Sequence, residues 1–320
     1  MNLVNKILSY VNLKVSSATT IKRNSENAEK NLRLVAEFYR NSINNKNGFN
    51  QDITGIVFSK DRAMQLHALL ASYFHFTKNA APLFVLFTCS NAEHERAYQI
   101  LKTEFVSFTV TFIAESNFRL DLQNIICKSN ADRVFFMTDD AVFVSEYDLD
   151  NCLQFNPIDY VFSLRLGRDF DFCYTHNIAQ EIPAFYDEKR GGIDLNSWIW
   201  NDMKGSPDWI YPLSVDATIF YKKEMEAFIN MIPFKSPNSL EAQMQKYTSL
   251  FLFRKGICYS TTKYINIPCN IVQTEFKNVS TNLFSTNELL QNFLDGKRID
   301  WHFPQNLKPR EVQLIKYSFI

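Results

Sequence analysis

The sequence predicts an α/β fold with a mixed, mostly parallel sheet flanked by helices. Short runs rich in β-branched and aromatic residues alternate with segments of ten to fifteen residues whose apolar side chains recur at helical spacing. Polar clusters follow directly after several of the strand-like runs. Strands that are separated by helices of this length form parallel sheets, and ligands gather at the carboxyl ends of such strands. The expected strands are residues 53–59, 82–88, 109–114 and 133–139, with expected helices at 62–74, 91–105 and 118–129.

The elements follow from local patterns. In the first expected helix, Met64, Leu66, Leu69, Leu70 and Phe74 lie on one face. The second helix can be capped by Ser90 or Asn91, whose side chains accept hydrogen bonds from free backbone N–H groups. Further along, 159–174 reads as an aromatic-rich strand, 217–221 as a strand leading into a helix, and 257–261 as another strand. The segment 287–301 reads as an amphipathic helix that ends at Gly296.

The first fifty residues differ in character from the rest. Residues 1–15 carry apolar side chains at roughly helical spacing, which suits a helix docked on its own domain or one that lies on a membrane surface. A polar stretch leads to a second expected helix at 31–40 and then to an Asn-rich linker. We expect three regions, namely a helical extension with its linker (1–50), a main domain (51–303) and a tail (304–320).

Composition narrows the function classes. The 320 residues are 46% hydrophobic, and 34 basic residues balance 34 acidic ones, so no global positive charge favours nucleic-acid binding. The six cysteines are dispersed and lack the spacing of a zinc site, which favours reduced thiols and a cytoplasmic location. No apolar run reaches the length of about 18 residues that a membrane span requires.

Asp139 and Asp140 lie between two apolar runs, in the segment RVFFMTDDAVFV. Two carboxylates at the end of a buried strand repel each other and resist desolvation, so they call for a cation or a strong hydrogen-bonding partner. Ser59, Asp61 and Arg62 follow the first strand and are expected at the same edge of the sheet.

Five segments together resemble bacterial nucleotide-sugar glycosyltransferases of the GT-A fold, of the family-2 type. The resemblance covers residues 53–301, and the segments that carry it are FSKDRAMQLHALLAS, FFMTDDAVFV, SLRLG, YPLSVDATIF and SPNSLEAQ. It implies a metal-dependent enzyme that moves a sugar from a nucleotide-sugar donor to a hydroxyl of a glycan acceptor.

The resemblance also implies roles on the donor side. Asp140 would bind Mn²⁺ or Mg²⁺, with Asp139 as a further ligand or as a partner of the ribose. Read one residue later, the motif would end in Ala141 and lack its final acid, which leaves the number of protein ligands open. His302 is a candidate additional ligand, with a structural role as its alternative. The remaining donor-binding candidates are Ser59, Asp61, Arg62, Arg119 and Arg165, and Arg62 has the alternative of pairing with Asp61 at the surface.

On the acceptor side the resemblance implies that Glu241 is the general base. Glu241 lies in the first turn of an expected helix at 234–256, capped by Asn238 or Ser239, where the helix dipole alone would also favour an acid. Asp216 is the reserve base. The expected reaction inverts the anomeric configuration, and retention is expected if neither carboxylate lies near the anomeric carbon.

The expected acceptor is a cell-surface polysaccharide or lipopolysaccharide, by analogy alone. Trp198, Trp200 and Trp209 could stack on its sugars or could fill the core. Nucleic acid is not an expected partner, whereas the inner face of a membrane could be contacted through the N-terminal helix.

Two alternative functions remain. A sugar nucleotidyltransferase also uses a parallel sheet with metal-binding acids, but its Gly-rich loop after the first strand has no counterpart in FSKDRAMQ. A non-catalytic sugar- or nucleotide-binding protein is the other, and the intact acidic pair argues against it.

Overall fold

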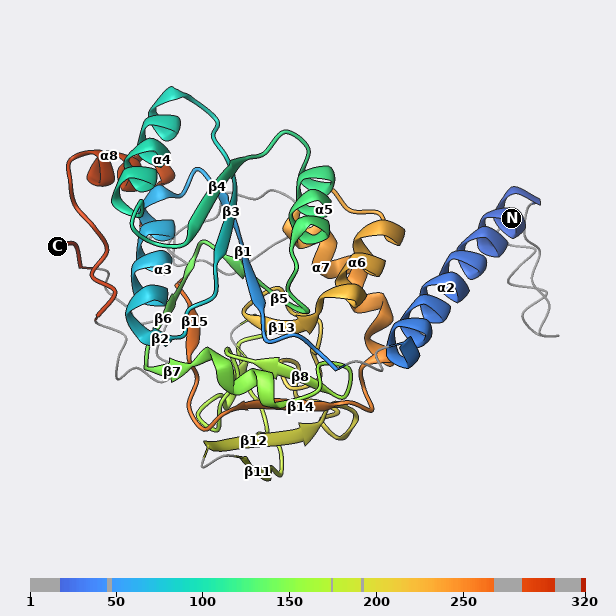
Figure 1. Ribbon diagram of the computed structural model, residues 1–320. Helices are drawn as coiled ribbons and strands as arrows, with labels where there is room; N and C mark the ends of the chain where they lie inside the picture. Colours follow the sequence, from blue (N-terminus) through green and yellow to red (C-terminus); the bar gives the residue numbers. More distant parts are fainter. Residues whose placement is uncertain (1–17, 45–47, 174, 191–192, 268–283, 303–317) are drawn as a thin grey trace. The chain divides into compact units, whose positions relative to one another are not determined.

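The computed structural model describes residues 18–44, 48–173, 175–190, 193–267, 284–302 and 318–320. The chain divides into two compact units, Met1–Lys46 and Asn47–Ile320. The second unit holds a large mixed sheet with helices on both faces (Figure 1), which confirms the predicted α/β class.

A nine-stranded sheet forms the centre of the second unit. Four neighbouring strands run parallel, and β8 and β14 are also parallel to each other. β13 is antiparallel to both of its neighbours, β5 and β8. From one edge to the other the strands are β11 (Tyr186–Arg190), β12 (Ile193–Ile199), β14 (Lys255–Tyr259), β8 (Tyr160–Ser163), β13 (Thr218–Tyr221), β5 (Arg133–Thr138), β1 (Ile53–Lys60), β3 (Leu83–Thr88) and β4 (Val110–Ala114).

Helices cover both faces of the parallel strands (Figure 1). On one side α3 (Ala63–Phe76), α4 (Ala92–Glu104) and α8 (Thr286–Leu294) contact one another. On the other side α5 (Phe118–Lys128) contacts α6 (Lys222–Met231), and α7 (Pro237–Met244) follows in the chain.

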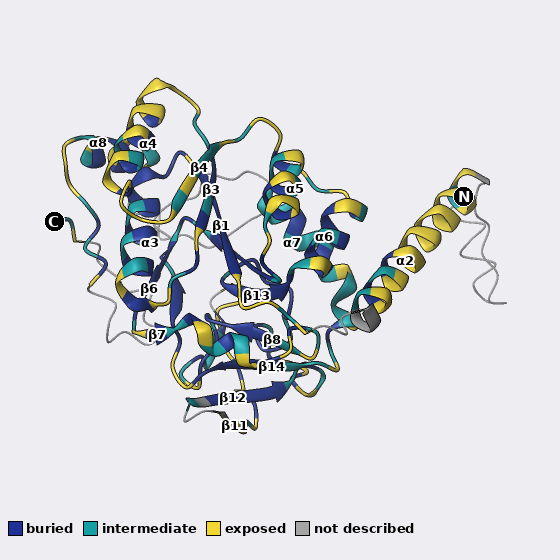
Figure 2. Ribbon diagram, viewed as in Figure 1, coloured by how far each residue is buried: buried dark blue, intermediate teal, exposed yellow. Residues whose placement is uncertain are grey.

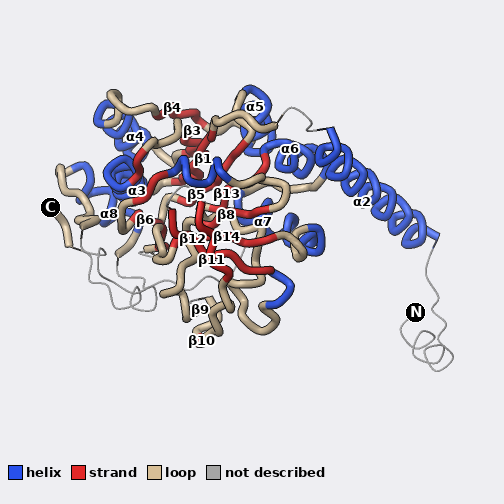
Figure 3. Tube along the Cα trace, turned by 60° about the horizontal axis from the view of Figure 1, so that its bottom comes forward, coloured by secondary structure: helices blue, strands red, loops and turns tan. Residues whose placement is uncertain are grey.

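Three short strand pairs lie outside the main sheet. They are β2 (Thr77–Lys78) with β7 (Tyr147–Asp148), β6 (Ala141–Phe143) with β15 (Tyr264–Asn266), and β9 (Phe172–Cys173) with β10 (Ile178–Ala179). Figure 3 shows β9 and β10 apart from the strands of the sheet. Three 3₁₀ helices, η2 (Leu149–Gln154), η3 (Trp200–Asp202) and η4 (Gln245–Leu250), complete the described elements of this unit.

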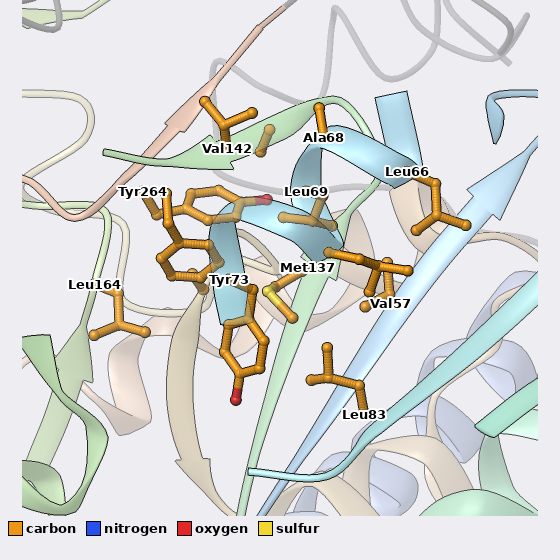
Figure 4. Packing of buried hydrophobic residues seen from close by; sticks show 14 of the residues in the cluster. Val57, Leu66, Ala68, Leu69, Tyr73, Leu83, Met137, Val142, Leu164 and Tyr264 are labelled. Atoms are coloured by element: carbon orange, nitrogen blue, oxygen red, sulfur yellow. The ribbon is translucent and has the colours of Figure 1, made fainter. Parts of the chain in front are cut away.

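The core lies between α3 and the sheet. Leu66, Leu69 and Tyr73 of α3 are fully buried and belong to one hydrophobic cluster with Val57 and Met137 of the strands (Figure 4). The central strands are buried on both faces, while the outer sides of the helices are exposed (Figure 2). This is why the strands read in the sequence as continuous apolar runs.

The N-terminal unit differs from the expectation. A single helix, α2 (Ala18–Asn44), includes the stretch that its polar composition assigned to a connection. It contains no Gly or Pro that would break it, and side-chain pairs such as Arg33–Glu29 (2.5 Å) add local support. The helix expected over residues 1–15 lies outside the described residues.

The caps were predicted with mixed success. Asn91 caps α4 by accepting hydrogen bonds from the backbone N–H groups of Glu93 and His94, as expected. α8 begins with a capping box formed by Ser285 and Glu288. The expected caps of α7 were wrong, because Ser236 is the capping residue and Pro237 occupies the first turn. The expected helix at 234–256 is also shorter, since η4 follows α7.

The three tryptophans fill the core of the β11–β14 side of the sheet. The ring of Trp198 contacts those of Trp200 and Trp209, with centroids 4.7 and 4.9 Å apart, and all three residues are at most 1% exposed. They are therefore not available to stack on a sugar in this structure. The five cysteines in the described part of the chain are free thiols. No helix in that part is both long and apolar enough to cross a bilayer.

Candidate active site

One edge of the sheet collects the polar residues that the sequence singled out. β1, β3 and β5 are parallel and in register, so their carboxyl ends lie at the same edge. β13 runs in the opposite direction, and its first residues therefore lie at that edge too, where the N–H of Ala217 donates to the carbonyl of Phe136 (2.8 Å). Loops after β1 and β5 and the loop before β13 thus meet.

Arg62 neutralises the acidic pair. Its Nη1 atom donates to Oδ1 of Asp139 and to Oδ2 of Asp140, both at 3.0 Å. Arg62 is 7% exposed and directly precedes α3, whose start holds it at the sheet edge. Burial alone would lower the pKa of Arg62, but the charges of Asp140 and Asp139 more than offset this and raise it. The partner that the two carboxylates require is therefore present in the chain itself.

Asp139 is enclosed by donors. Its Oδ2 atom accepts hydrogen bonds from Oγ of Ser59 (2.8 Å) and from the backbone N–H of Lys60 (3.2 Å). The hydroxyl of Tyr98 lies 2.5 Å from Oγ of Ser59 and so supports it from α4. Burial raises the pKa of Asp139 to about 6, with Arg62 acting in the opposite direction. At neutral pH Asp139 is ionised, and its neighbours hold it in place.

Asp140 is the more open member of the pair. Its side chain is 25% exposed, compared with 5% for Asp139. Among the described residues, no group of three or more His, Cys, Asp or Glu side chains could hold a metal ion. Mg²⁺ in phosphate-transfer sites is commonly held by one or two carboxylates together with substrate phosphates. The donor set around Asp140 fits a metal shared with a diphosphate, and it does not fit a site made by the protein alone.

Asp216 adjoins the acidic pair through Thr138. Thr138, the last residue of β5, donates from Oγ1 to Oδ1 of Asp216 (3.0 Å). Burial raises the pKa of Asp216, the charge of Arg165 lowers it, and the charge of Asp140 raises it again. The electrostatic interaction between Asp140 and Asp216 means that the two halves of the edge form one site.

Glu241 belongs to the same site. From α7 its Oε1 atom accepts the backbone N–H of Val215 (2.9 Å), which ties the helix to the loop before β13. Burial and, after it, the neighbouring charge of Asp216 raise the pKa of Glu241 to about 7, although the hydrogen bond from Val215 and the charge of Arg165 act in the opposite direction. A carboxylate with a pKa near neutrality is suited to accept a proton.

Arg165 is the second buried cation of the site. It follows β8 and donates from Nη2 to Oδ1 of Asp208 (2.8 Å). Gln180 donates to the other oxygen of Asp208 (3.2 Å) and so fixes it. The charge of Arg165 also lowers the pKa values of both Asp216 and Glu241.

Asp61 has a different partner from the one considered for it. Its two carboxylate oxygens accept hydrogen bonds from the backbone N–H and the hydroxyl of Ser90 (2.7 and 2.5 Å), and His94 lies 3.9 Å away. Asp61 adopts a positive φ of 55°, which is unusual outside glycine. The contact with Ser90 joins the loop after β1 to the loop after β3. The alternative of a surface pair between Arg62 and Asp61 is not what the structure shows, because Arg62 is buried against the acidic pair.

Two of the predicted site residues lie elsewhere. Arg119, on α5, donates to the backbone carbonyl of Asn230 (2.9 Å) and lies over the ring of Phe234. Nδ1 of His302 lies 3.1 Å from Oδ1 of Asp300, and the ring stacks on that of Trp301, close to His75 near the end of α3 that is remote from Arg62. The structure does not bring either side chain to Asp140.

Sequence reasoning missed several residues of this site. Tyr98 lies on the apolar face of α4, where an aromatic residue reads as core, and Asp208 and Gln180 lie in loops without a motif. The sequence indicated only that buried carboxylates need hydrogen-bonding or charged partners, and it did not indicate which residues these partners are.

No protein-family model matches the chain. A curated relative, the bifunctional glycosyltransferase pgtA of Dictyostelium discoideum, is 32% identical over 192 residues, which cover 55% of this chain and 25% of the relative. The chain thus spans about a quarter of the length of that protein.

Two solved structures of glycosyltransferases are similar to this chain at low sequence identity. S. aureus TarS 1–349 in complex with UDP is 14% identical, covers 82% of this chain and 68% of its own, and has a TM-score of 0.44. Mannosyltransferase PcManGT from Pyrobaculum calidifontis in complex with GDP-Man and Mn²⁺ is also 14% identical, covers 46% and 50%, and has a TM-score of 0.30. The resemblance of this chain to glycosyltransferases, expected from its motifs, is confirmed by the curated relative over the matched residues.

Proposed function

We propose that the chain is a glycosyltransferase that transfers a sugar from a nucleotide-sugar donor to a hydroxyl group of a glycan acceptor. One observation carries this proposal. The pair Asp139–Asp140 and the carboxylates Asp216 and Glu241 occupy one edge of the sheet, joined by the 3.0 Å hydrogen bond between Thr138 and Asp216. Such a transfer requires one group of residues that binds the diphosphate, here Asp139 and Asp140, and another that accepts a proton, here Asp216 and Glu241. The 32% identity to a protein named as a glycosyltransferase supports the same function.

On the donor side, Asp140 would hold Mn²⁺ or Mg²⁺ together with the diphosphate. The metal, when bound, supplies positive charge that stabilises the departing nucleoside diphosphate. Asp139, supported by Ser59, keeps Arg62 beside this position. Asp61 holds the neighbouring loop through Ser90, and that loop would contact the nucleoside.

On the acceptor side, Glu241 accepts the proton of the attacking hydroxyl. The acceptor oxygen forms a bond to the anomeric carbon while the bond from that carbon to the diphosphate breaks, so the anomeric configuration inverts. Asp216 is the reserve for the base role, and Arg165 balances the charge of both carboxylates. The acceptor is proposed to be a cell-surface glycan, such as a polysaccharide or lipopolysaccharide. Contact with a membrane through residues 1–15 is part of the same proposal, and these residues lie outside the described ones.

The test is a panel of sugar nucleotides incubated with the protein, Mn²⁺ and candidate glycan acceptors, with released nucleotide as the readout. We expect one donor class to be turned over. The variant Glu241→Gln should lose transfer at least about a hundredfold, the usual contribution of a general base, while nucleotide binding stays near the wild-type value. Normal turnover by that variant would remove Glu241 from the base role. Release of pyrophosphate from a sugar phosphate and a nucleoside triphosphate would instead identify a nucleotidyltransferase.

A further inference from the structure

Arg62 is more than a donor-binding residue, because a single nitrogen atom bonds both members of the acidic pair. Nη1 carries two N–H groups, and one points to Asp139 while the other points to Asp140, each at 3.0 Å. The positive charge of Arg62 therefore already lies next to Asp140, where a metal ion would otherwise be attracted. A metal ion and Arg62 compete for the same carboxylate.

We propose that Arg62 keeps divalent metal affinity low until a nucleoside diphosphate is present, and that the diphosphate then takes over part of the bonding of Arg62. This inference rests on the proposed function and adds a binding order to it. Metal and nucleotide would enter together, and metal alone would bind weakly.

Charge supports this exchange. With the donor absent, one guanidinium faces two carboxylates, so a dication would have to compete with a cation that is already hydrogen-bonded to both. A diphosphate brings negative charge and oxygen atoms that accept N–H donors as well as carboxylates do. Asp140 could then turn to the metal, while Asp139 remains held by Ser59 and Lys60.

The division of exposure between the two acids agrees with this arrangement. Asp139 is 5% exposed and has donors from three residues, so it acts as the fixed anchor of Arg62. Asp140 is 25% exposed and is the member that can exchange its partner. Because the described residues offer no cluster of three metal-binding groups, the diphosphate is needed to complete the coordination.

The experiment measures Mn²⁺ binding by the loss of the free-ion signal in electron paramagnetic resonance, alone and with UDP or GDP. For the wild type, we expect weak binding of Mn²⁺ alone and much tighter binding with one of the two nucleotides. In Arg62→Gln, Mn²⁺ alone should bind about tenfold more tightly, and the nucleotide with Mn²⁺ about tenfold more weakly, within the usual range of coupling between two ligands. The two affinities move in opposite directions, which a merely structural loss does not produce.

Arg168→Gln is the matched control. Arg168 also bonds an aspartate, Asp187 (2.9 Å), but the pair is exposed and lies on the β11–β12 side of the sheet. This variant should leave both affinities at wild-type values. Arg62→Lys keeps the charge but loses the planar donor group, so Mn²⁺ alone should bind with intermediate affinity; this variant carries the test if Arg62→Gln does not fold.

The outcomes separate the two proposals. If Mn²⁺ binds with a nucleotide but the Arg62 variants leave both affinities unchanged, or lower both together, the exchange at Arg62 is refuted and the proposed function stands. If neither UDP nor GDP promotes Mn²⁺ binding in any variant, both the metal-dependent function and the exchange are refuted.

Discussion

Each half of the candidate site pairs its carboxylates with one buried arginine. Arg62 serves Asp139 and Asp140, and Arg165 serves Asp208 while its charge also acts on Glu241. Removing one partner of a buried ion pair leaves the other charge without compensation, which costs several kcal/mol. The positive charges of Arg62 and Arg165 therefore allow these carboxylates to lie close together, and the chemistry of the carboxylates depends on both arginines.

The Tyr98 hydroxyl is expected to act through Ser59 on the acidic pair. Tyr98→Phe removes the group 2.5 Å from Oγ of Ser59, so we expect a loss of about 1–2 kcal/mol in the free energy of unfolding and weaker nucleotide binding. Calorimetric titration with UDP or GDP and Mn²⁺, together with urea unfolding, measures both effects.

Tyr147→Phe is the control for this prediction. Its hydroxyl is also buried and accepts a hydrogen bond from Oγ1 of Thr77 (2.8 Å), but at the β2–β7 pair beyond the other end of α3. A similar loss of stability with unchanged nucleotide affinity is expected. Equal nucleotide affinity in both variants would show that Tyr98 has no role in positioning Asp139.

Glu241 should make stability depend on pH. Its folded pKa of about 7 lies above the ordinary value of 4.5, so the folded state binds the proton more strongly and loses stability as pH rises from about 4.5 to about 7. Glu241→Gln removes this loss and should be more stable than the wild type at pH 8, by roughly 2–3 kcal/mol, with no such gain near pH 4.5. Urea unfolding at the two pH values measures the difference.

Glu224→Gln provides a contrast of opposite sign. Glu224 is 1% exposed and accepts two hydrogen bonds from Arg254 (2.7 and 2.9 Å). Burial raises the pKa of Glu224 as well, against the charge of Arg254, but its replacement also leaves the charge of Arg254 without its partner, so Glu224→Gln should destabilise the protein at pH 8. If Glu241→Gln also lowered stability at pH 8, the inference that the folded state raises the pKa of Glu241 would be wrong.

At the scale of elements, the predictable features were those encoded locally. β1, β3 and β5 are buried on both faces and were visible as apolar runs, and Asn91 was visible as a cap of α4. The order of strands was not visible, because the insertion of β13 between β5 and β8 depends on contacts between distant segments. In the same way the sequence identified Asp139 and Asp140 as candidate site residues, because both lie in one local motif. It did not identify Arg62 as the partner of both, because that contact depends on the register of β1 with β5.

The contact between β14 and β12 should tolerate no added side chain at Gly256. A Cβ atom there would lie 2.3 Å from ring atoms of Trp198, which is 1% exposed and packed against other rings. Gly256→Ala should therefore lower stability by about 1–3 kcal/mol, the usual cost of overpacking. Thermal unfolding measures it.

A double variant tests whether the ring is the cause. Trp198→Phe removes the ring atoms that face Gly256, so Gly256→Ala should cost less in that background than in the wild type. Strictly additive losses would mean that the strand backbone, and not the contact with Trp198, resists the substitution.

At the scale of the whole molecule, the site belongs entirely to the second unit. Every described residue of the candidate site lies between Ser59 and Glu241, and the first residue of the described part of the chain that belongs to the main hydrophobic cluster is Ile53. Folding of this unit and formation of the site thus depend on the same core, with α3 contributing both buried side chains and the start that holds Arg62.

Removal of residues 1–46 should leave a folded unit that binds nucleotide with wild-type affinity, because none of the described residues in the deleted segment belongs to that core. A longer deletion, of residues 1–52, is the sharper comparison. It also removes Asn50, whose backbone N–H donates to Asp132 (2.7 Å) and whose carbonyl accepts from Arg133 (3.0 Å) at the start of β5. Arg133 is 2% exposed, so the loss of one of its hydrogen-bond acceptors should cost about 1–3 kcal/mol. Thermal unfolding of both truncated chains should place the shorter deletion near the wild type and the longer one clearly below it. Unfolding of the 47–320 chain at room temperature would show instead that the N-terminal unit is required for the fold.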